Sequence, residues 1–324
     1  MQNQSPDTHS LVNNIIGTKK MKRIIISLSF FLGTFQLFAQ QDPTFGQYIF
    51  NSSIINPAQA GVQEANQIGV LARRQWVGME GAPSTNSIYV NTRLQKNLGF
   101  AGGIYTDQVG PINTVTLQGD IASHIRLNDK WTMSAGIRLM GSNTKANLTT
   151  LPTNQSSDPN FSNNYNSGFN LNLGGGLLVY SERFFVGAAM PRLFSREMKD
   201  GNTTVLSIQN HLNIYGGANV KVSEDLMVTP SVLVRTTANA PMALDLNFMF
   251  NYKNIIDFGP MLRYNDAFGI LVGYKISPNF YAGYMYEYPL SDIQMASKQT
   301  HEITLRMSWV SKYKTQVRSP RYFL

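Results

Sequence analysis

The stretch Asn113–Lys145 reads NTVTLQGDIASHIR, LNDK and WTMSAGIRLMGSNTK, two alternating segments joined by a polar turn at Leu127–Lys130. In its first segment, apolar residues such as Val115 and Leu117 alternate with polar ones, and the polar side includes Asp120. A period of two is that of a β-strand, whose successive side chains point to opposite faces. A strand with one apolar and one charged face is typical of a membrane barrel, with lipid outside and a polar lumen inside.

The same pattern recurs along the chain in about fourteen segments of roughly ten residues, a length that crosses a bilayer at a tilt. In Met242–Tyr252 the apolar residues oppose Asp245, and in Glu302–Trp309 they oppose Glu302 and Arg306. No later apolar stretch is long enough for a spanning helix, which leaves a closed barrel as the way to cross. The sequence therefore predicts an all-β fold, a transmembrane antiparallel β-barrel of the outer membrane with about fourteen strands, over residues 66–309.

The connections between these segments alternate between short and long. With the N-terminus on the periplasmic side, the short periplasmic turns are predicted at Gln95–Asn97, Leu127–Lys130, Ser181–Arg183, Ser223–Asp225, Lys253–Asn254 and Ser277–Asn279. The long polar connections include Ala146–Ser167, Pro191–Ser207 and Leu290–Lys298, and one short exception falls at Asn265–Asp266. Short turns on one side and longer loops on the other are the pattern of outer-membrane barrels.

Aromatic residues and two prolines bear on this prediction in opposite directions. Trp131, Tyr252, Phe280 and Trp309 fall on the outward face near periplasmic strand ends, where a membrane barrel carries its aromatic girdle.

Pro230 and Pro260 fall inside strands, where each removes a hydrogen-bond donor, and they predict bulges or shifted strand bounds. A soluble antiparallel sandwich also alternates, but it explains neither the loop lengths nor the inward charges.

The first residues predict an export signal. Lys19, Lys20, Lys22 and Arg23 precede the apolar run Ile24–Phe38, and Ala39 is a small residue placed for cleavage. We expect residues 1–39 to be a signal peptide, with Met21 as an alternative start. The other interpretation, an N-terminal membrane anchor, is disfavoured because the run is short and polar residues follow it.

Composition excludes several classes of function. The chain has no cysteine, so disulfides and thiolate metal sites are not available. The net charge of +8 is mild and scattered, and part of it belongs to the signal peptide, so a nucleic-acid partner is not expected. No phosphate loop, dinucleotide fingerprint or metal cluster occurs in the sequence, and we expect no cofactor and no metal.

Two motifs with a histidine are catalytic candidates. The sequence HEITL at His301 lacks a second histidine, and on a strand His301 and Glu302 point to opposite faces. Asp120 and His124 share the inward face but lie roughly 13 Å apart along a strand, too far for a hydrogen bond. We therefore predict that the protein is not an enzyme.

The predicted lumen has many small residues and a candidate to fill the space they leave. The inward-facing glycines are Gly99, Gly103, Gly136, Gly174, Gly176, Gly217, Gly259, Gly269, Gly273 and Gly283. The segment 40–65 precedes the first strand and alternates weakly, but it contains apolar, Asn and Pro residues. It is predicted either as a plug or partner-docking strand, or as an ordered periplasmic lead-in packed under the barrel.

A set of short motifs, in order, covers nearly all of the chain after the signal peptide. They are Gln47, Tyr48 and Asn51; Asn56, Pro57, Ala58 and Gly61; Arg74, Gln75, Trp76, Val77 and Gly78 followed by Gly81, Ala82 and Pro83; Phe185, Val186, Gly187 and Pro191; Gly273, Tyr274, Gly283, Tyr284, Leu290, Ser291 and Asp292; His301, Glu302, Ile303 and Leu305; and Ser319, Pro320, Arg321, Tyr322 and Phe323. In this order they resemble the PorP/SprF family of type IX secretion membrane proteins.

The resemblance implies an outer-membrane barrel of a Bacteroidota-type bacterium that works with the type IX secretion machinery. Some members of that family associate with periplasmic components, and others are paired with a large exported surface protein such as a gliding adhesin. The expected partners are therefore outer-membrane lipids, type IX secretion components and the C-terminal domain of a secreted surface protein. Export and surface anchoring of that protein both stay open.

A binding platform is consistent with both the residues and the resemblance. The residues predicted to bind partners are Gln47, Tyr48, Asn51, Asn56, Pro57, Gly61, Arg74, Gln75, Trp76, Gly78, Gly81 and Pro83. The basic tail 310–324 either contacts secretion components in the periplasm or is solvated. The alternative function is an outer-membrane channel or solute transporter with an N-terminal plug, which the strand pattern does not separate from a platform.

Overall fold

The computed structural model describes residues 45–63, 65–150, 163–200, 203–238, 240–297 and 299–313. All of these residues belong to one compact unit, Ala39–Leu324. The predicted signal peptide (1–39), the first residues of the predicted lead-in (40–44) and most of the predicted tail (314–324) lie outside the described residues.

The described chain is nearly all sheet. The strands are β1 (Ala65–Arg74), β2 (Ser84–Gln95), β3 (Leu98–Val109), β4 (Ile112–Arg126), β5 (Thr132–Ala146), β6 (Tyr165–Tyr180), β7 (Phe184–Met190), β8 (Arg196–Asp200), β9 (Thr203–Ile208), β10 (His211–Ala218), β11 (Val220–Lys221), β12 (Leu226–Thr237), β13 (Ala243–Tyr252), β14 (Ile256–Arg263), β15 (Ala267–Lys275), β16 (Phe280–Pro289) and β17 (Thr300–Val310). Short 3₁₀ turns are η1 (Ser52–Ile54), η2 (Pro57–Gln59), η3 (Leu148–Thr150) and η5 (Asp292–Met295). No helix in these ranges is long and apolar enough to cross a membrane.

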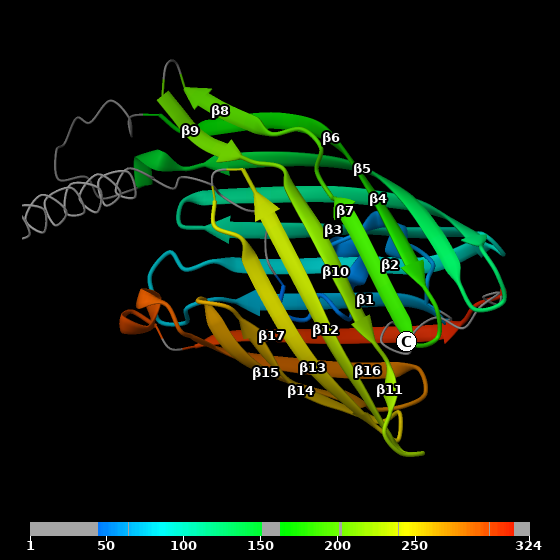
Figure 1. The fold of residues 1–324 in the computed structure, drawn as a ribbon. Coiled ribbons are helices and arrows are strands. Elements are labelled where there is room, and N and C mark those ends of the chain that lie inside the picture. The colour runs from blue at the N-terminus through cyan, green and yellow to red at the C-terminus, as the bar shows by residue number, and fades with distance from the viewer. Residues whose placement is uncertain are drawn as a thin grey trace, which may run out of the picture. The chain divides into compact units, whose positions relative to one another are not determined.

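The strands close into a ring of antiparallel neighbours. Consecutive strands pair along the chain, β1 pairs with β17, and β10 pairs with both β7 and β12 (Figure 1). β10 and β11 are two parts of one strand, interrupted at Asn219, and both pair with β12. Within the described residues the fold is therefore a closed antiparallel barrel of fourteen strands, which confirms the predicted fold class.

Connection lengths follow the prediction at one end of the barrel and depart from it in two places at the other. The predicted short turns all fall between observed strands, and we call this end the short-turn end. At the opposite, long-loop end, β3 and β4 are joined by only Gly110 and Pro111, a second short connection beside the one at Tyr264–Asp266. The predicted loop Pro191–Ser207 holds all but the last residue, Ile208, of the hairpin β8–β9. This hairpin is a separate two-stranded sheet, and its strands are too short to show a clear alternation in the sequence.

The expectation of bulges or shifted bounds at the two strand prolines was wrong. Pro230 and Pro260 each keep a partner on one neighbouring strand, Phe248 and Ile270 respectively. On the other neighbour the ladder is interrupted at the proline, but it resumes in the same register on both sides. The missing N–H of each proline therefore interrupts the ladder locally but does not shift the register of the strand.

The two faces of the wall differ as predicted. On β5, Ile137 is 69 % exposed on the outside, whereas its neighbour Arg138 is 2 % exposed on the inside. The girdle residues Tyr252, Phe280 and Trp309 are exposed on the outer face near the short-turn end. The barrel thus presents an apolar band outward and buries a polar, charged lining, which is what a strand wall in lipid requires.

Candidate functional site

Residues 45–63, which we call the lumenal segment, lie inside the barrel. Almost all of them are buried, although the segment has no strand pairing of its own. The second 3₁₀ turn, η2, contacts β4, β5 and β6, and Figure 1 shows the blue chain before β1 within the ring of strands. A segment this buried needs partners for its backbone groups, and it finds them in the barrel lining.

Asn56 is the central anchor of the segment. Its Oδ1 accepts a hydrogen bond from Ala58 N at 2.8 Å, which caps η2, and Pro57 occupies the first position of that turn. Its Nδ2 donates to Leu177 O at 2.9 Å and to Tyr215 Oη at 3.0 Å, on two different strands. One side chain thus defines the local turn and fixes it to the wall.

Wall glycines make room for the segment. A Cβ added at Gly136 would overlap the backbone of Pro57 and Ala58, and one at Gly99 would overlap the backbone of Ala60 and Gly61. A Cβ at Gly176 would overlap Asn56 Oδ1. Inward glycines therefore lie where the segment approaches the wall closely, and larger residues at these positions would expel it.

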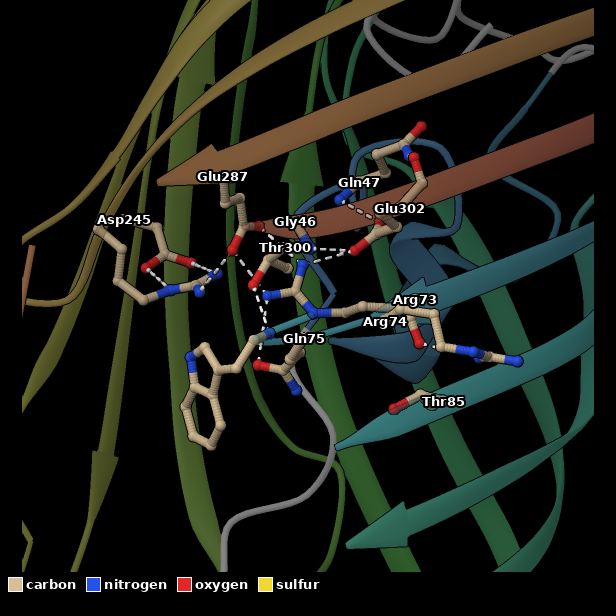
Figure 2. Close-up of polar contacts among 12 residues, drawn as sticks. Gly46, Gln47, Arg73, Arg74, Gln75, Thr85, Asp245, Glu287, Thr300 and Glu302 are labelled. Atoms are coloured by element: carbon tan, nitrogen blue, oxygen red, sulfur yellow. Dashed lines mark hydrogen bonds and ion pairs between the residues drawn. The ribbon is translucent and has the colours of Figure 1, made fainter. Parts of the chain in front are cut away.

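The beginning of the segment is bound to a carboxylate near the long-loop end. Gly46 N and Gln47 N donate to the two oxygens of Glu302, at 2.9 and 2.7 Å. Gln47 Nε2 donates to Glu302 O at 2.9 Å, so the same residue is also held through its side chain. Figure 2 shows Gly46, Gln47 and Arg73 gathered around Glu302.

Arg73 links Glu302 to a second carboxylate. Its Nη1 lies 2.8 Å from Glu302 Oε2 and 2.7 Å from Glu287 Oε1, and its Nη2 lies 2.7 Å from Glu287 Oε2 (Figure 2). Arg263 lies 3.6 Å from Glu287 and 3.0 Å from Asp245, and Asp245 also meets Arg235 at 3.1 Å. We call Arg73, Arg235, Arg263, Asp245, Glu287 and Glu302 the ion-pair cluster.

The ion-pair cluster balances three cations with three anions in a buried place. Arg73, Asp245 and Glu302 are almost fully buried, and each charge has an opposite partner in the cluster. Buried charges of this kind are tolerated only when they are paired and hydrogen-bonded, and removing one member leaves the others uncompensated. The cluster thus fixes several strands and the start of the lumenal segment to one another.

A second buried pair holds the middle of the segment. Arg138 Nε and Nη2 each donate to a different oxygen of Asp120 at 2.7 Å, and the same guanidinium donates to the carbonyls of Ser53 and Ile54. Farther down, His124 Nε2 lies 2.9 Å from Ala60 O, and Gly61 N donates to Asn91 Oδ1 at 2.7 Å. Inward-facing charged and amide side chains therefore form hydrogen bonds with the backbone of the segment along its length.

At the long-loop end, two loops are bonded to each other. The β1–β2 loop (75–83) and the β16–β17 loop (290–299) are called here the rim loops. Trp76 N donates to Thr300 Oγ1 at 3.1 Å, Val77 N donates to Gln299 O at 2.8 Å, and Ser297 Oγ donates to Val77 O at 3.0 Å. Gly81 O accepts from Gly110 N at 2.8 Å, which ties in a third connection.

Trp76 has an unusual backbone. Its φ of 47° lies in the left-handed region, which is uncommon for a bulky residue and costs free energy. The bonds from Trp76 N to Thr300 at the start of β17 and from Val77 N to Gln299 of the facing loop hold it there. Val77, the next residue, and Met295 of the facing rim loop are exposed, at 44 % and 84 %. A strained residue in a fixed loop with exposed apolar neighbours is a candidate for a binding surface.

The predicted partner-binding residues fall into two separate groups. Gln47, Tyr48, Asn51, Asn56, Pro57 and Gly61 are buried in the lumen, where their partners are the barrel's own residues; Tyr48, for example, accepts from Asn247 Nδ2 at 2.8 Å. Arg74, Gln75, Trp76, Gly78, Gly81 and Pro83 lie at the end of β1 and in the rim loops. Binding of an external partner by either group stays a prediction.

Sequence reasoning missed the ion-pair cluster and the separate Asp120–Arg138 pair, although part of the signal for both is in the hairpin register. Asp120 faces Arg138 and Asp245 faces Arg263 across predicted short turns, so their pairing follows once the turns are placed. Arg73 faces Glu302 between the first and last strands, a pairing that needs barrel closure. Glu287 lies on β16, the neighbour of β17, where it faces Thr300, so it reaches Arg73 from the second strand along the closed ring.

The two catalytic candidates are held apart by different partners. Asp120 pairs with Arg138, whereas His124 contacts the carbonyl of Ala60. His301 lies on the outer face and contacts Tyr284 Oη at 2.6 Å, while Glu302 points inward. Within the described residues no group of three or more His, Cys, Asp or Glu side chains could hold a metal ion.

Cavities lie on both sides of the lumenal segment. A small one, about 50 Å³, opens near the long-loop end, where Tyr48 and Ile55 meet His211 and Thr237. A larger one, about 340 Å³, lies at the short-turn end, where Ile49 and Phe50 of the segment form one side. The segment thus separates the two spaces.

Replacing Asn56 tests how firmly the segment is held. We expect Asn56→Ala to loosen residues 56–62 by about 1–3 kcal/mol, because it strips a capping acceptor and two wall contacts from a buried site. The measurement is hydrogen exchange of these amides in the detergent-solubilised barrel. Asn86→Ala, which removes only an exposed contact to Arg74, is the control and should change nothing. Equal protection in both variants would contradict the anchoring role.

Solved structures similar to this chain are barrels of low sequence identity. They include the Acinetobacter baumannii outer membrane protein Omp33 (9 % identity, TM-score 0.45, 77 % of this chain and 100 % of that one). A Pseudomonas aeruginosa FadL homologue has 10 % identity and a TM-score of 0.47 over 83 % of this chain and 94 % of its own. The CymD monoaromatic hydrocarbon channel has 11 % identity and a TM-score of 0.46 over 84 % and 94 %. None of the curated proteins matches the chain.

A family comparison is more informative than these structures. The model of the family described as "Type IX secretion system membrane protein PorP/SprF" matches residues 37–307, which include the lumenal segment and nearly all of the barrel. The motifs of the lumenal segment and rim loops lie inside this match, in agreement with the resemblance drawn from the sequence. With its closed fourteen-stranded barrel and this match, the chain belongs to the PorP/SprF family of type IX secretion system membrane proteins.

Proposed function

We propose that this outer-membrane barrel is a non-enzymatic platform of the type IX secretion system, whose rim loops bind the C-terminal domain of a large secreted protein. The partner is a surface protein such as a gliding adhesin, which the barrel helps to export or anchors at the cell surface. The lumenal segment keeps the barrel closed while the platform works.

The observation that carries the proposal is the fixed, strained Trp76 at the joined rim loops. A bulky residue in the left-handed region is retained only where surrounding bonds enforce it, and such strain is concentrated at functional sites. Val77, the next residue, and Met295 of the facing rim loop expose apolar surface, and Trp is a frequent anchor of protein interfaces. A rigid loop pair loses little conformational entropy when a partner binds.

The filled lumen supports a platform over an open pore. A fourteen-stranded barrel lies between filled eight-stranded barrels and open sixteen-stranded porins, so its lumen needs an occupant to be closed. The lumenal segment is that occupant, and it is held by the ion-pair cluster, by Arg138 and by Asn56.

The proposed orientation follows from the loop lengths. The long-loop end faces the outside of a Bacteroidota-type cell, and the short-turn end faces periplasmic secretion components. Residues 1–39 are proposed to be the signal peptide that directs the chain to the envelope.

A single substitution in the rim loops tests the binding role. We expect Trp76→Ala to weaken binding of the partner's C-terminal domain by about 2–3 kcal/mol, roughly a hundredfold, as for a central aromatic anchor. The measurement is affinity purification of the tagged barrel from outer membranes in mild detergent, followed by titration with the co-purifying domain.

Trp131→Ala is the matched control, because Trp131 is a girdle residue at the short-turn end and far from the rim loops. Both variants must keep the heat-modifiable gel shift of a folded barrel. Equal binding by Trp76→Ala and the unchanged protein, or purification of a barrel without any partner after cross-linking, would contradict the proposal.

A channel or solute transporter with an N-terminal plug is the second candidate. The cavity at the short-turn end favours it, because a space of about 340 Å³ next to the segment can receive a small solute. Steady, solute-sensitive conductance of the unchanged protein in planar bilayers would favour this candidate over the platform.

A further inference from the structure

A groove crosses the outer face of the barrel over β17, β1, β2 and β3, and we call it the outer-face groove. Its volume is about 400 Å³, and its apolar lining comes from Val70, Ala72, Ile88, Ile104, Ile303 and Leu305. The wall is hollow here because Ala72 is short, whereas the branched side chains around it are exposed on the outer face. Ala72 faces Ile303 on β17 and Asn86 on β2. An apolar groove in a lipid-facing wall has the lining that an aliphatic chain requires.

Aromatic side chains mark the level of the lipid head groups beside this groove, toward the long-loop end. Tyr284 and Tyr286 lie on the outer face of β16, and both contact His301 of β17. Tyr284 Oη lies 2.6 Å from His301 Nδ1, and the ring centre of Tyr286 lies 5.6 Å from that of His301. Aromatic residues gather where a membrane barrel meets the head groups. His301 faces Arg74 directly across β17 and β1, so Arg74 lies at the same level.

Arg74 presents a pair of hydrogen-bond donors at this level. Its Nη1 donates to Arg73 O and to Asn86 Oδ1, each at 3.1 Å, which orients the guanidinium. Among the described residues, its Nε and Nη2 have no acceptor and the side chain pairs with no carboxylate. The same Nε–Nη2 edge of Arg138 binds the two oxygens of Asp120. In Arg74 this edge is therefore open to an oxyanion from outside the protein, such as a phosphate.

We propose that one acyl chain of an outer-leaflet lipid lies in the outer-face groove and that the Nε–Nη2 edge of Arg74 binds the phosphate of its head group. The groove and the cation lie in the order that such a lipid requires, with the chain toward the middle of the membrane and the phosphate toward its surface.

The proposed orientation of the long-loop end places this site in the outer leaflet. The abundant lipid there is a phosphorylated, acylated glycolipid, and we take this lipid as the occupant. The inference rests on that part of the proposed function and does not depend on partner binding at the rim loops.

Lipid binding to the purified barrel in detergent tests the head-group contact. The probe is lipid A, compared with the same lipid after removal of its phosphate, and native mass spectrometry measures the lipid-bound fraction. We expect Arg74→Leu to weaken binding of lipid A by about ten- to a hundredfold, because it removes hydrogen bonds to a charged group. The dephosphorylated lipid should bind weakly, and equally so to Arg74→Leu and to the unchanged protein.

Arg183→Leu is the matched control for the loss of charge. Arg183 is an exposed arginine in the β6–β7 turn at the short-turn end, and its replacement should leave binding of lipid A unchanged. Equal binding of lipid A by Arg74→Leu and Arg183→Leu would overturn the proposal. Arg74-dependent binding of phosphatidylglycerol in preference to lipid A would also overturn it, because the site would then belong to the inner leaflet.

A second substitution tests the groove while Arg74 stays in place. Ala72→Phe fills the hollow and should lower binding of lipid A several-fold. Ala188→Phe adds the same ring to the outer face of β7 and should change nothing. Both variants must keep the heat-modifiable gel shift, and equal binding of lipid A by the two would contradict a role for the groove. These readouts do not involve the partner of the rim loops, so a failure of Trp76→Ala to weaken partner binding is a separate result.

Discussion

Gly136→Leu is expected to turn a silent barrel into a conducting one. Gly136 faces the lumen, and a Cβ there would overlap the backbone of Pro57 and Ala58, which cannot move aside within the filled barrel. The leucine should therefore expel the lumenal segment and leave an open lumen. The width of this lumen would lie between those of filled eight-stranded barrels and open sixteen-stranded porins. In planar bilayers we expect no large stable conductance from the unchanged protein, and porin-like steps from the variant.

The matched control is Gly175→Leu, on the strand that pairs with the strand of Gly136. Gly175 faces outward, where the nearest atom to an added Cβ is Gly136 O at 3.9 Å, so a leucine there enters lipid-facing space. This variant should stay silent and fold normally. Deletion of residues 45–61 provides a second route to the open lumen if Gly136→Leu folds poorly. Large steady conductance from the unchanged protein would contradict the closed lumen and move the function to the channel.

Arg73→Leu is expected to cause the largest loss of stability of any single substitution in the barrel lining. It removes the cation that meets Glu287 and Glu302 at 2.7 and 2.8 Å, and both carboxylates are almost fully buried. Breaking a buried ion pair from one side costs about 3–5 kcal/mol, because an uncompensated charge remains. The measurement is the midpoint of urea unfolding in detergent, followed by the heat-modifiable gel shift.

Arg74→Leu controls for the loss of a positive charge at the same end of β1. Arg74 is exposed and donates to Asn86 Oδ1 and to the carbonyl of Arg73, so its replacement should change stability by less than about 0.5 kcal/mol. Adding Glu302→Gln to Arg73→Leu should recover part of the loss, since fewer buried charges then lack a partner. Similar losses from Arg73→Leu and Arg74→Leu would show that the cluster contributes no special stability.

The two predictions are connected through Glu302. The carboxylate that meets Arg73 also accepts Gly46 N and Gln47 N, so Arg73→Leu should loosen the start of the lumenal segment as well as the wall. We expect faster hydrogen exchange at the Gly46 and Gln47 amides in Arg73→Leu, and an unchanged exchange rate in Arg74→Leu.

Local rules were sufficient for the wall of the barrel. Alternation along β4 and β5 separated Ile137 from Arg138, and the turn at Leu127–Lys130 set their pairing, because side-chain direction in a strand depends only on position in the chain. The same rule failed for the hairpin β8–β9, whose few residues carry too little pattern, and it overestimated the effect of Pro230 and Pro260 on strand register.

The sequence by itself thus determined the barrel, its strand faces, its turns and the family motifs in their order, since each depends on neighbours in the chain. Tertiary structure alone decided where residues 45–63 lie, because a segment without periodicity carries no signal of the wall it will meet. It also decided that Arg73 forms ion pairs with Glu287 and Glu302 and that Trp76 N donates a hydrogen bond to Thr300. These contacts join residues more than two hundred positions apart, and only closure of the barrel brings β1 beside β17.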